Sequence, residues 1–466
     1  MKPCEMYSPV AFQLDWIIYL HVRSALVPLY LSCDLKTAKG TEVMATLRVD
    51  NIVLNGEATR IFCRDGHISE IGGDATEADE VLDGRGMTVL PPLLNAHTHA
   101  SMTLFRGNGD DLPLMEWLQT RVWPYEEKIT ADEIYWGARL AGLEMIRSGC
   151  TFFNDMYWDF GAVARAVEET GIRACLSAVF IDFGDPDKSK QQRAGIEQTY
   201  KTLDQYSNRI QFAVSPHAIY TVSEDSLRWA AAFSLEHNVL FHTHLAETHE
   251  EVVNCQQEHG CSPVEYIERI GALNERTLAA HTVWLTESDI RLLGEHKVVC
   301  AHNPVSNMKL AVGETYPYRK LRDAGAITAL ATDGAGSNNN LDMFEDMKIA
   351  ALLQKYRDSD PTSLPAVEAW RMATHNPAAY FGLTGSEIHV GREADFILVD
   401  LARPEMNPPH DLYSHLVYAA NGTIVDSVVC DGRVLMKHRE IEGEDEVIAK
   451  ANEAAITLFE RIDKAK

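Results

Sequence analysis

Through the middle of the chain, short apolar segments alternate with segments that have helical periodicity. Eight apolar segments follow one another at residues 88–99, 150–155, 173–180, 209–217, 238–244, 276–281, 297–304 and 326–333. Short apolar runs of this kind are typical of strands that are buried on both faces of a parallel sheet. The pattern therefore predicts an α/β fold, a (β/α)8 TIM-like barrel over residues 91–384.

Capping signals mark the helices between these strands. Thr130 and Glu133 have the spacing of a capping box, and the helical pattern that they open stops at Gly149. A second helical segment stops at Gly171, and another begins after Thr286 with an acidic first turn. A doubly wound sheet is the alternative, but no GxGxxG motif follows the first strand to support a dinucleotide site.

Alternating apolar and polar positions return towards both ends of the chain. Residues 44–90 and 385–440 contain short strands around Asn-Gly and Asp-Gly turns. We expect these two segments to form one small β-sandwich domain, with the barrel inserted between them. Residues 441–466 are predicted to form a C-terminal helix.

Residues 1–43 form an N-terminal extension whose role the sequence does not reveal. The extension is apolar but is interrupted by Asp15, His21 and Arg23, and its longest uncharged piece, Ser24–Cys33, has ten residues. This is about half the length of a spanning helix. The extension also lacks the pattern of a signal peptide, so we expect no membrane attachment.

Composition narrows the classes of partner. The chain has 42 Lys and Arg against 68 Asp and Glu, a formal net charge of −26. Such acidity disfavours nucleic acid, because phosphate binding depends on clustered basic residues. The nine cysteines include no CxxC motif, and several lie in apolar runs, which is typical of reduced thiols in a cytoplasmic protein.

Histidine and aspartate residues stand at the ends of the predicted strands. They are His97, His99, Asp155, His217, His244, His281, His302 and Asp333. The carboxyl ends of the strands of such a barrel meet on one face, where active sites form. His97 and His99 point the same way, because alternate residues of a strand share a face.

A metal site is the best interpretation of this pattern. A single histidine that closes a strand is more often a structural residue, and Asp333 before Gly334 could simply form a turn. His244 and Asp333 could nevertheless complete a site that begins with His97 and His99. Imidazoles and a carboxylate without thiolates favour Zn²⁺, with Fe²⁺ or Mn²⁺ as alternatives.

Several motifs together resemble a known superfamily. "NAHTH", "HLAE", "LAAH", "HNPVSNMKL", "TDGAGSNNN" and "GREADFILVDL" resemble those of the amidohydrolases, which are metal-dependent hydrolases. More narrowly, they look like the 5′-methylthioadenosine/S-adenosylhomocysteine deaminases and the 5′-deoxyadenosine deaminases. The resemblance runs from about Ala45 to the C-terminus. No lysine closes the second to fifth strands, as it does in dinuclear relatives, so we expect one metal ion per subunit.

The resemblance also implies roles for individual residues. The implied metal ligands are His97, His99, His244 and Asp333. Glu247 takes the place of the acid that shuttles protons, and Asp333 also acts in catalysis and lies against the substrate. His281 would orient the nucleophilic water.

Substrate contacts follow from the same comparison of motifs. Glu126, in "WPYEEKI", falls where the family binds the ribose hydroxyls, and His217, in "SPHAIY", falls where it contacts the nucleoside. Glu247 would also contact the purine. Family members that accept S-adenosylhomocysteine have an arginine near the end of the third strand, and this chain has none there. Arg193 could substitute from the following segment, and smaller 5′-substituents are favoured.

The implied reaction is the hydrolytic deamination of an adenosine-type nucleoside to the inosine analogue and ammonia. The candidate substrates are 5′-methylthioadenosine, S-adenosylhomocysteine, 5′-deoxyadenosine and adenosine, and the sequence is compatible with a homo-oligomer. Another mononuclear amidohydrolase, acting on guanine, a pterin or an s-triazine, is the alternative. A non-catalytic scaffold is disfavoured because such relatives lose ligands, whereas every expected ligand position is filled here.

Overall fold

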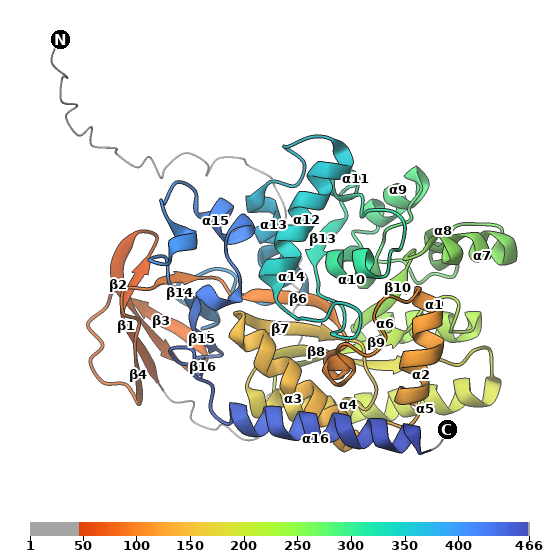
Figure 1. Cartoon of the computed structure of the whole chain (residues 1–466), viewed down its shortest axis with the longest axis horizontal. Coiled ribbons are helices and arrows are strands. Elements are labelled where there is room, and N and C mark those ends of the chain that lie inside the picture. The colour runs from red at the N-terminus through yellow and green to blue at the C-terminus, as the bar shows by residue number, and fades with distance from the viewer. Residues whose placement is uncertain (1–45, 465–466) are drawn as a thin grey trace, which may run out of the picture. The chain divides into compact units, whose positions relative to one another are not determined.

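A parallel barrel forms the centre of the computed structural model, which describes residues 46–464 (Figure 1). Its strands are β6 (Leu93–Thr98), β7 (Cys150–Asp155), β8 (Arg173–Phe180), β9 (Ile210–Pro216), β10 (Leu240–Leu245), β11 (Thr277–His281), β12 (Val299–His302) and β13 (Ile327–Leu330). Each strand pairs in parallel with the next one along the chain. The backbone N–H of Asp333 donates to the carbonyl of His97 at 3.1 Å and so links the last strand to the first. The predicted eight-stranded barrel is confirmed.

Helices connect the barrel strands or follow the last of them, and they cover the sheet. They are α3 (Ala131–Arg147), α4 (Phe160–Thr170), α5 (Pro186–Lys201), α6 (Glu224–His237), α7 (His249–His259), α8 (Pro263–Arg269), α9 (Glu287–Glu295), α10 (Pro304–Lys309), α11 (Tyr318–Ala324), α12 (Met343–Asp358), α13 (Ala366–Met372) and α14 (His375–Phe381). The Thr130–Glu133 capping box is present, and Gly171 ends α4 with a φ of 77°. This left-handed conformation is easy for glycine because it has no Cβ.

The connection between β6 and α3 is longer than the others and contains several short helical pieces. They are η1 (Ala100–Phe105), α1 (Leu114–Trp117), the π-helical turn Leu118–Val122 and α2 (Trp123–Glu126). Aromatic and aliphatic residues recur through this segment, and several of them line the pocket described below. The segment therefore forms a wall of the site.

Strands from both ends of the described chain share one mixed sheet, in the order β16-β15-β14-β5-β1-β2-β3, with β4 paired to β1. Their bounds are β1 (Leu47–Leu54), β2 (Glu57–Arg64), β3 (His67–Ile71), β4 (Glu80–Asp83), β5 (Thr88–Leu90), β14 (Phe396–Val399), β15 (Val425–Cys430) and β16 (Arg433–Met436). The two ends meet where β5 pairs antiparallel with β14. This sheet has an apolar core of its own, which includes Val49, Ile61 and Phe396.

Buried ion pairs fasten this sheet to the barrel. The guanidinium of Arg173, at the start of β8, donates to Asp395 at 2.8 Å and to Asp431 at 3.0 Å. Arg209, just before β9, also donates to Asp431. These four side chains are at most 9% exposed. The joint lies at the amino ends of the strands, so it leaves the opposite face of the barrel free for a site.

The chain continues through η4 (Pro404–Met406), α15 (Leu412–Tyr418) and η5 (Gly422–Ile424) and closes with α16 (Glu444–Asp463). Helix α16 lies along α3, and Arg461 donates to Glu133 at 2.6 Å (Figure 1). No described helix is long and apolar enough to cross a membrane. The predicted extension, residues 1–43, lies outside the described residues. The seven described cysteines form no disulfide.

Candidate metal centre and active-site pocket

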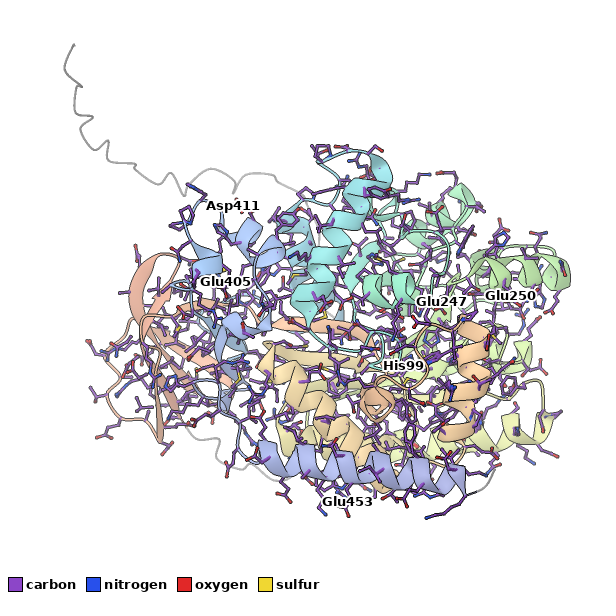
Figure 2. The ribbon with its side chains drawn as sticks, in the orientation of Figure 1. His99, Glu247, Glu250, Glu405, Asp411 and Glu453 are labelled. Carbon is purple, nitrogen blue, oxygen red and sulfur yellow. The ribbon has the colours of Figure 1, made fainter. Side chains whose placement is uncertain are left out.

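His99, a predicted metal ligand, and Glu247, the predicted proton-shuttling acid, lie in the interior, whereas acidic residues such as Glu250, Asp411 and Glu453 lie at the periphery (Figure 2). His99 directly follows β6, and Glu247 follows β10. Both side chains line the same pocket. The barrel therefore brings together residues that are far apart in the sequence.

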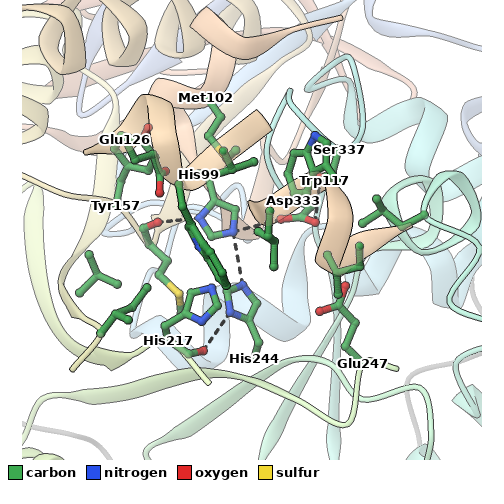
Figure 3. A pocket seen from close by; sticks show the side chains of 18 of the residues that line it. His99, Met102, Trp117, Glu126, Tyr157, His217, His244, Glu247, Asp333 and Ser337 are labelled. Atoms are coloured by element: carbon green, nitrogen blue, oxygen red, sulfur yellow. Dashed lines mark hydrogen bonds and ion pairs between the residues drawn. The ribbon is translucent and has the colours of Figure 1, made fainter. Parts of the chain in front are cut away.

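The four residues predicted as metal ligands lie close together, and two of the histidines contact one oxygen of the Asp333 carboxylate. Asp333 Oδ1 lies 3.4 Å from Nε2 of His97 and 3.2 Å from Nε2 of His99. Nε2 of His99 lies 3.3 Å from Nε2 of His244 (Figure 3). These residues come from β6, β10 and the segment after β13, so strand ends from across the barrel form the cluster.

Backbone carbonyls fix the orientation of two of these rings. Nδ1 of His99 donates to the carbonyl of Met156 at 2.6 Å, and Nδ1 of His244 donates to the carbonyl of His217 at 2.9 Å. A neutral imidazole that donates through Nδ1 presents a lone pair at Nε2. The Nε2 lone pairs of His99 and His244 therefore face each other at the cluster.

The third ring has a histidine as its partner. Nδ1 of His97 lies 2.8 Å from Nε2 of His242, a fully buried residue whose Nδ1 is 3.3 Å from the Asn154 side-chain nitrogen. His242 thus contacts Nδ1 of His97, whereas Nε2 of the same His97 ring lies near the Asp333 carboxylate. Such outer partners orient the histidines that bind metals.

The donor set fits a divalent metal ion. Nε2 of His97 is buried and has no hydrogen-bond partner among the described residues. Two further imidazole lone pairs and a carboxylate oxygen lie beside it, and they would repel one another without a positive charge between them. Nitrogen and oxygen donors in this number, without thiolates, suit Zn²⁺ and also Fe²⁺ or Mn²⁺.

The surroundings of the Asp333 carboxylate keep it ionised. Burial acts to raise its pKa, but the contacts with His97 and His99 outweigh burial and hold the pKa of Asp333 well below its usual value. Oδ2 also accepts from the hydroxyls of Ser306 at 2.6 Å and Ser337 at 2.9 Å. Oδ2 of Asp333 therefore accepts from the two serine hydroxyls, while Oδ1 faces the histidines. Sequence reasoning missed both serines, although "HNPVSN" and "TDGAGS" contain them.

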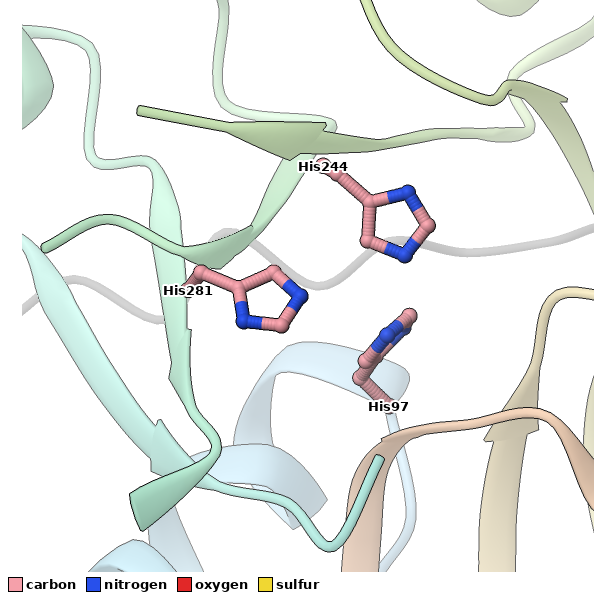
Figure 4. A group of neighbouring side chains, drawn as sticks. All are labelled: His97, His244 and His281. Atoms are coloured by element: carbon pink, nitrogen blue, oxygen red, sulfur yellow. The ribbon is translucent and has the colours of Figure 1, made fainter. Parts of the chain in front are cut away.

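His281 lies at the edge of the cluster. Candidate ligand atoms of His97, His244 and His281 all lie within 4.8 Å of one another (Figure 4). Nδ1 of His281 donates to the side-chain oxygen of Asn307 at 2.8 Å. His281 has a φ of 73°, which is uncommon for a residue other than glycine. Such strained backbone is frequent at functional sites.

Glu247 lines the same pocket as three of the predicted metal ligands. Its Oε1 is 3.7 Å from Nδ1 of His281, and the residue is 5% exposed. Burial raises the pKa of Glu247, although His281 opposes the shift. A raised pKa suits a carboxyl group to act as a general acid towards a bound molecule.

An apolar pocket leads away from the cluster towards Glu126 (Figure 3). Its walls are mainly aromatic and aliphatic, with contributions from Met102, Leu114, Trp117, Leu118, Val122, Trp123, Met156, Val179, Ile181 and Leu310. No lysine or arginine is among the described residues that line it. The pocket therefore suits a largely neutral molecule with polar groups at two separate places.

Glu126 forms the polar group at the other end. Burial raises the pKa of its carboxyl group, and hydrogen bonds from Trp158 and Tyr157 oppose the shift. Tyr157 and Trp158 follow β7 and also line the pocket. Sequence reasoning missed both, although their position directly after a barrel strand was a usable signal.

His217 also lines the pocket. Burial lowers its pKa to about 3, so the ring is neutral near pH 7. Its Nδ1 lies 3.0 Å from the Thr221 hydroxyl, and the ring centroid is 4.7 Å from that of His244. The structure thus brings His217 to the site, as the strand-end pattern predicts.

Arg193 lies elsewhere. Its guanidinium donates to the Ser226 hydroxyl at 2.9 Å and lies over the ring of Trp229. It is not among the residues that line the pocket. Because α5 directs this side chain towards α6, we do not retain Arg193 as a substrate contact.

The barrel and its histidine–aspartate cluster define a class of metal-dependent hydrolase, and the chain belongs to the amidohydrolase family, whose model matches residues 88–435. It is 47% identical over 394 residues to 5-methylthioadenosine/S-adenosylhomocysteine deaminase 1 of Archaeoglobus fulgidus, covering 84% of this chain and 93% of that protein. It is also 47% identical over 386 residues to a 5′-deoxyadenosine deaminase of Methanospirillum hungatei, covering 83% and 86% of the two chains.

A solved structure of an adenosine deaminase from Xanthomonas campestris with bound zinc is similar as well. It superposes with a TM-score of 0.82 at 32% identity, over 90% of this chain and 98% of that chain. An atrazine chlorohydrolase from Arthrobacter aurescens shares the fold, with a TM-score of 0.78 at 22% identity over 88% of this chain and all of that chain.

Proposed function

We propose that this protein is a metal-dependent deaminase that hydrolyses adenosine-type nucleosides to the inosine analogue and ammonia. One observation carries the proposal. A buried acid with a raised pKa, Glu247, lines the same pocket as His99, His244 and Asp333 of the cluster, and a second acid, Glu126, lines that pocket as well. The relatives named as deaminases of methylthioadenosine, S-adenosylhomocysteine and 5′-deoxyadenosine support the same reaction.

The metal would be held by His97, His99, His244 and Asp333. Hydrogen bonds from outside the cluster orient their side chains. Zn²⁺ is the favoured ion, with Fe²⁺ or Mn²⁺ as alternatives. A divalent ion at such ligands lowers the pKa of water to near 7, which supplies hydroxide at neutral pH.

Proton transfer would be the task of the neighbouring acids. Glu247 gives its proton to the purine N1 as C6 is attacked, which makes the ring a better electrophile. Asp333 stays ionised, so it can accept the proton of the nucleophile and return it to the departing amine. His281 lies beside the cluster and would orient the nucleophile, because Asn307 holds its Nδ1.

The pocket would hold the rest of the nucleoside. A carboxylate can accept hydrogen bonds from two adjacent hydroxyls, so Glu126 suits the 2′- and 3′-hydroxyls of ribose. His217 would contact the nucleoside beside the cluster. The apolar walls and the absence of lysine and arginine among the described lining residues favour neutral 5′-substituents. We therefore expect methylthioadenosine and 5′-deoxyadenosine to be better substrates than S-adenosylhomocysteine.

Ammonia release tests the proposal. The purified metal-loaded protein is assayed with adenosine, 5′-deoxyadenosine, 5′-methylthioadenosine and S-adenosylhomocysteine, together with adenine and guanine as free bases. We expect turnover of the nucleosides and little turnover of the bases. Comparable activity on a free base would contradict the role of Glu126, and inactivity on all four nucleosides would overturn the proposed function.

A further inference from the structure

The first turn of helix α7 contains a buried carboxylate that the proposed chemistry does not use. Glu251 is 5% exposed, and it is not a candidate metal ligand. Its Oε1 accepts the backbone N–H of Ala246, and its Oε2 accepts the backbone N–H of Glu247, both at 2.8 Å. The carboxylate thus binds the two peptide units that precede the Glu247 side chain.

Other helices of the chain show that this arrangement differs from ordinary capping. Within residues 46–464, three helices begin with a capping box, in which the acid three residues after the N-cap accepts the N–H of the N-cap residue itself. The pairs are Thr130–Glu133, Ser262–Glu265 and Thr286–Asp289. In α7, Thr248 caps the helix and Glu251 has the equivalent position, but its carboxylate reaches further back, to residues 246 and 247. The position of Glu251 three residues after the N-cap therefore does not by itself explain its contact with the N–H groups of Ala246 and Glu247.

The backbone that Glu251 binds is strained. Ala246 has a φ of 53°, in the left-handed region that is unfavourable for residues other than glycine. Its carbonyl accepts the N–H groups of Val283 at 3.0 Å and Trp284 at 2.9 Å. The successive N–H groups of Ala246 and Glu247 form a binding place for an anion, which the Glu251 side chain occupies.

We propose that Glu251 is a positioning residue, whose carboxylate fixes the Ala246 and Glu247 peptide units and so holds the Glu247 carboxyl group in the pocket. The inference rests on the proposed role of Glu247 in deamination. A carboxyl group that must transfer a proton has to be placed within hydrogen-bond reach of its target, and a displacement of about 1 Å can reduce a rate about 100-fold. Glu251 acts through Glu247 and not on the substrate.

Glu251→Gln is the test variant. Glutamine has nearly the same shape, but it has one acceptor oxygen, and its NH₂ group would face one of the two backbone donors. Glu265→Gln is the matched control, because Glu265 has the same capping position in α8 and accepts a single backbone N–H, at 3.2 Å, away from the pocket. Glu251→Asp, which keeps the charge on a shorter side chain, is a second variant if Glu251→Gln does not fold.

Two measurements decide the inference. Hydrogen exchange reports directly on the Ala246 and Glu247 amides, and we expect about tenfold faster exchange there in Glu251→Gln because a hydrogen bond is lost. We also expect kcat to fall about 10- to 100-fold, with KM within about threefold and metal content equal to that of the wild type. Glu265→Gln should match the wild type in each respect.

A double-mutant cycle separates positioning from a general effect on the fold. In a Glu247→Gln background, assayed with enzyme in excess, adding Glu251→Gln should reduce turnover no further. An equal loss in both backgrounds, or unchanged amide exchange in Glu251→Gln, would overturn the inference. If the wild type deaminates no nucleoside, the proposed function fails, while the exchange measurement still decides whether Glu251 fixes this backbone.

Discussion

The Nε2 atoms of His99 and His244 face each other across 3.3 Å. Each ring donates its Nδ1 hydrogen to a backbone carbonyl, so each Nε2 carries a lone pair. Two lone pairs directed at each other are unfavourable unless a cation lies between them. The carbonyls of Met156 and His217 thus prepare the two rings for a metal ion. Without the ion the two lone pairs would repel each other in the folded protein. Loss of the ion should therefore lower the stability of the protein as well as its activity.

Metal removal is the first prediction. Treatment with a chelator should abolish ammonia release and lower the melting temperature, and Zn²⁺ should restore both. An ion present at about 1,000 times its Kd stabilises the folded state by about 4 kcal/mol. Calorimetry with and without added metal measures the shift. Full activity in protein shown to contain no metal would contradict the metal assignment.

Asp333→Ala should lose both bound metal and activity. The substitution removes the oxygen that lies near Nε2 of His97 and of His99. Ser337→Ala is the control, because it removes one hydrogen bond to the other oxygen, Oδ2, and leaves the carboxylate in place. Elemental analysis and turnover are measured together. Retention of wild-type metal content in Asp333→Ala would exclude Asp333 as a ligand.

Glu247→Ala should separate metal binding from catalysis. Glu247 is outside the cluster of predicted ligands, so the metal content should stay at the wild-type value. General acid catalysis contributes about 10²- to 10⁴-fold, so kcat should fall by at least about 100-fold. Ammonia release beside elemental analysis gives both values. Undiminished turnover, or loss of the metal, would show that Glu247 has another role.

Arg173→Ala should destabilise the protein without acting on the site. The change leaves Asp395 and Asp431 buried without this partner, and breaking a buried ion pair costs about 3–5 kcal/mol. Arg291→Ala is the control, since its pair with Glu295 is exposed and such pairs contribute about 0–1 kcal/mol. Urea unfolding measures the difference. KM of the folded Arg173 variant should equal that of the wild type.

The sequence by itself determined the barrel and the residues at its rim. Buried parallel strands are short and apolar, so eight of them could be counted directly, and the histidine or aspartate that ends most of them is a local feature. The pairing of His97 with His99 on one face follows from strand periodicity alone. The residue types then limited the chemistry to imidazole and carboxylate ligands.

Only the tertiary structure decided how these residues are used. Sequence periodicity carries no information on distances across a barrel, which depend on strand register and on the paths of the connecting helices. Three contacts are therefore features of the fold. His242 contacts His97, Arg193 donates to Ser226, and Glu251 accepts two backbone N–H groups. Each depends on where a side chain ends in space, and the order of residues along the chain does not specify this.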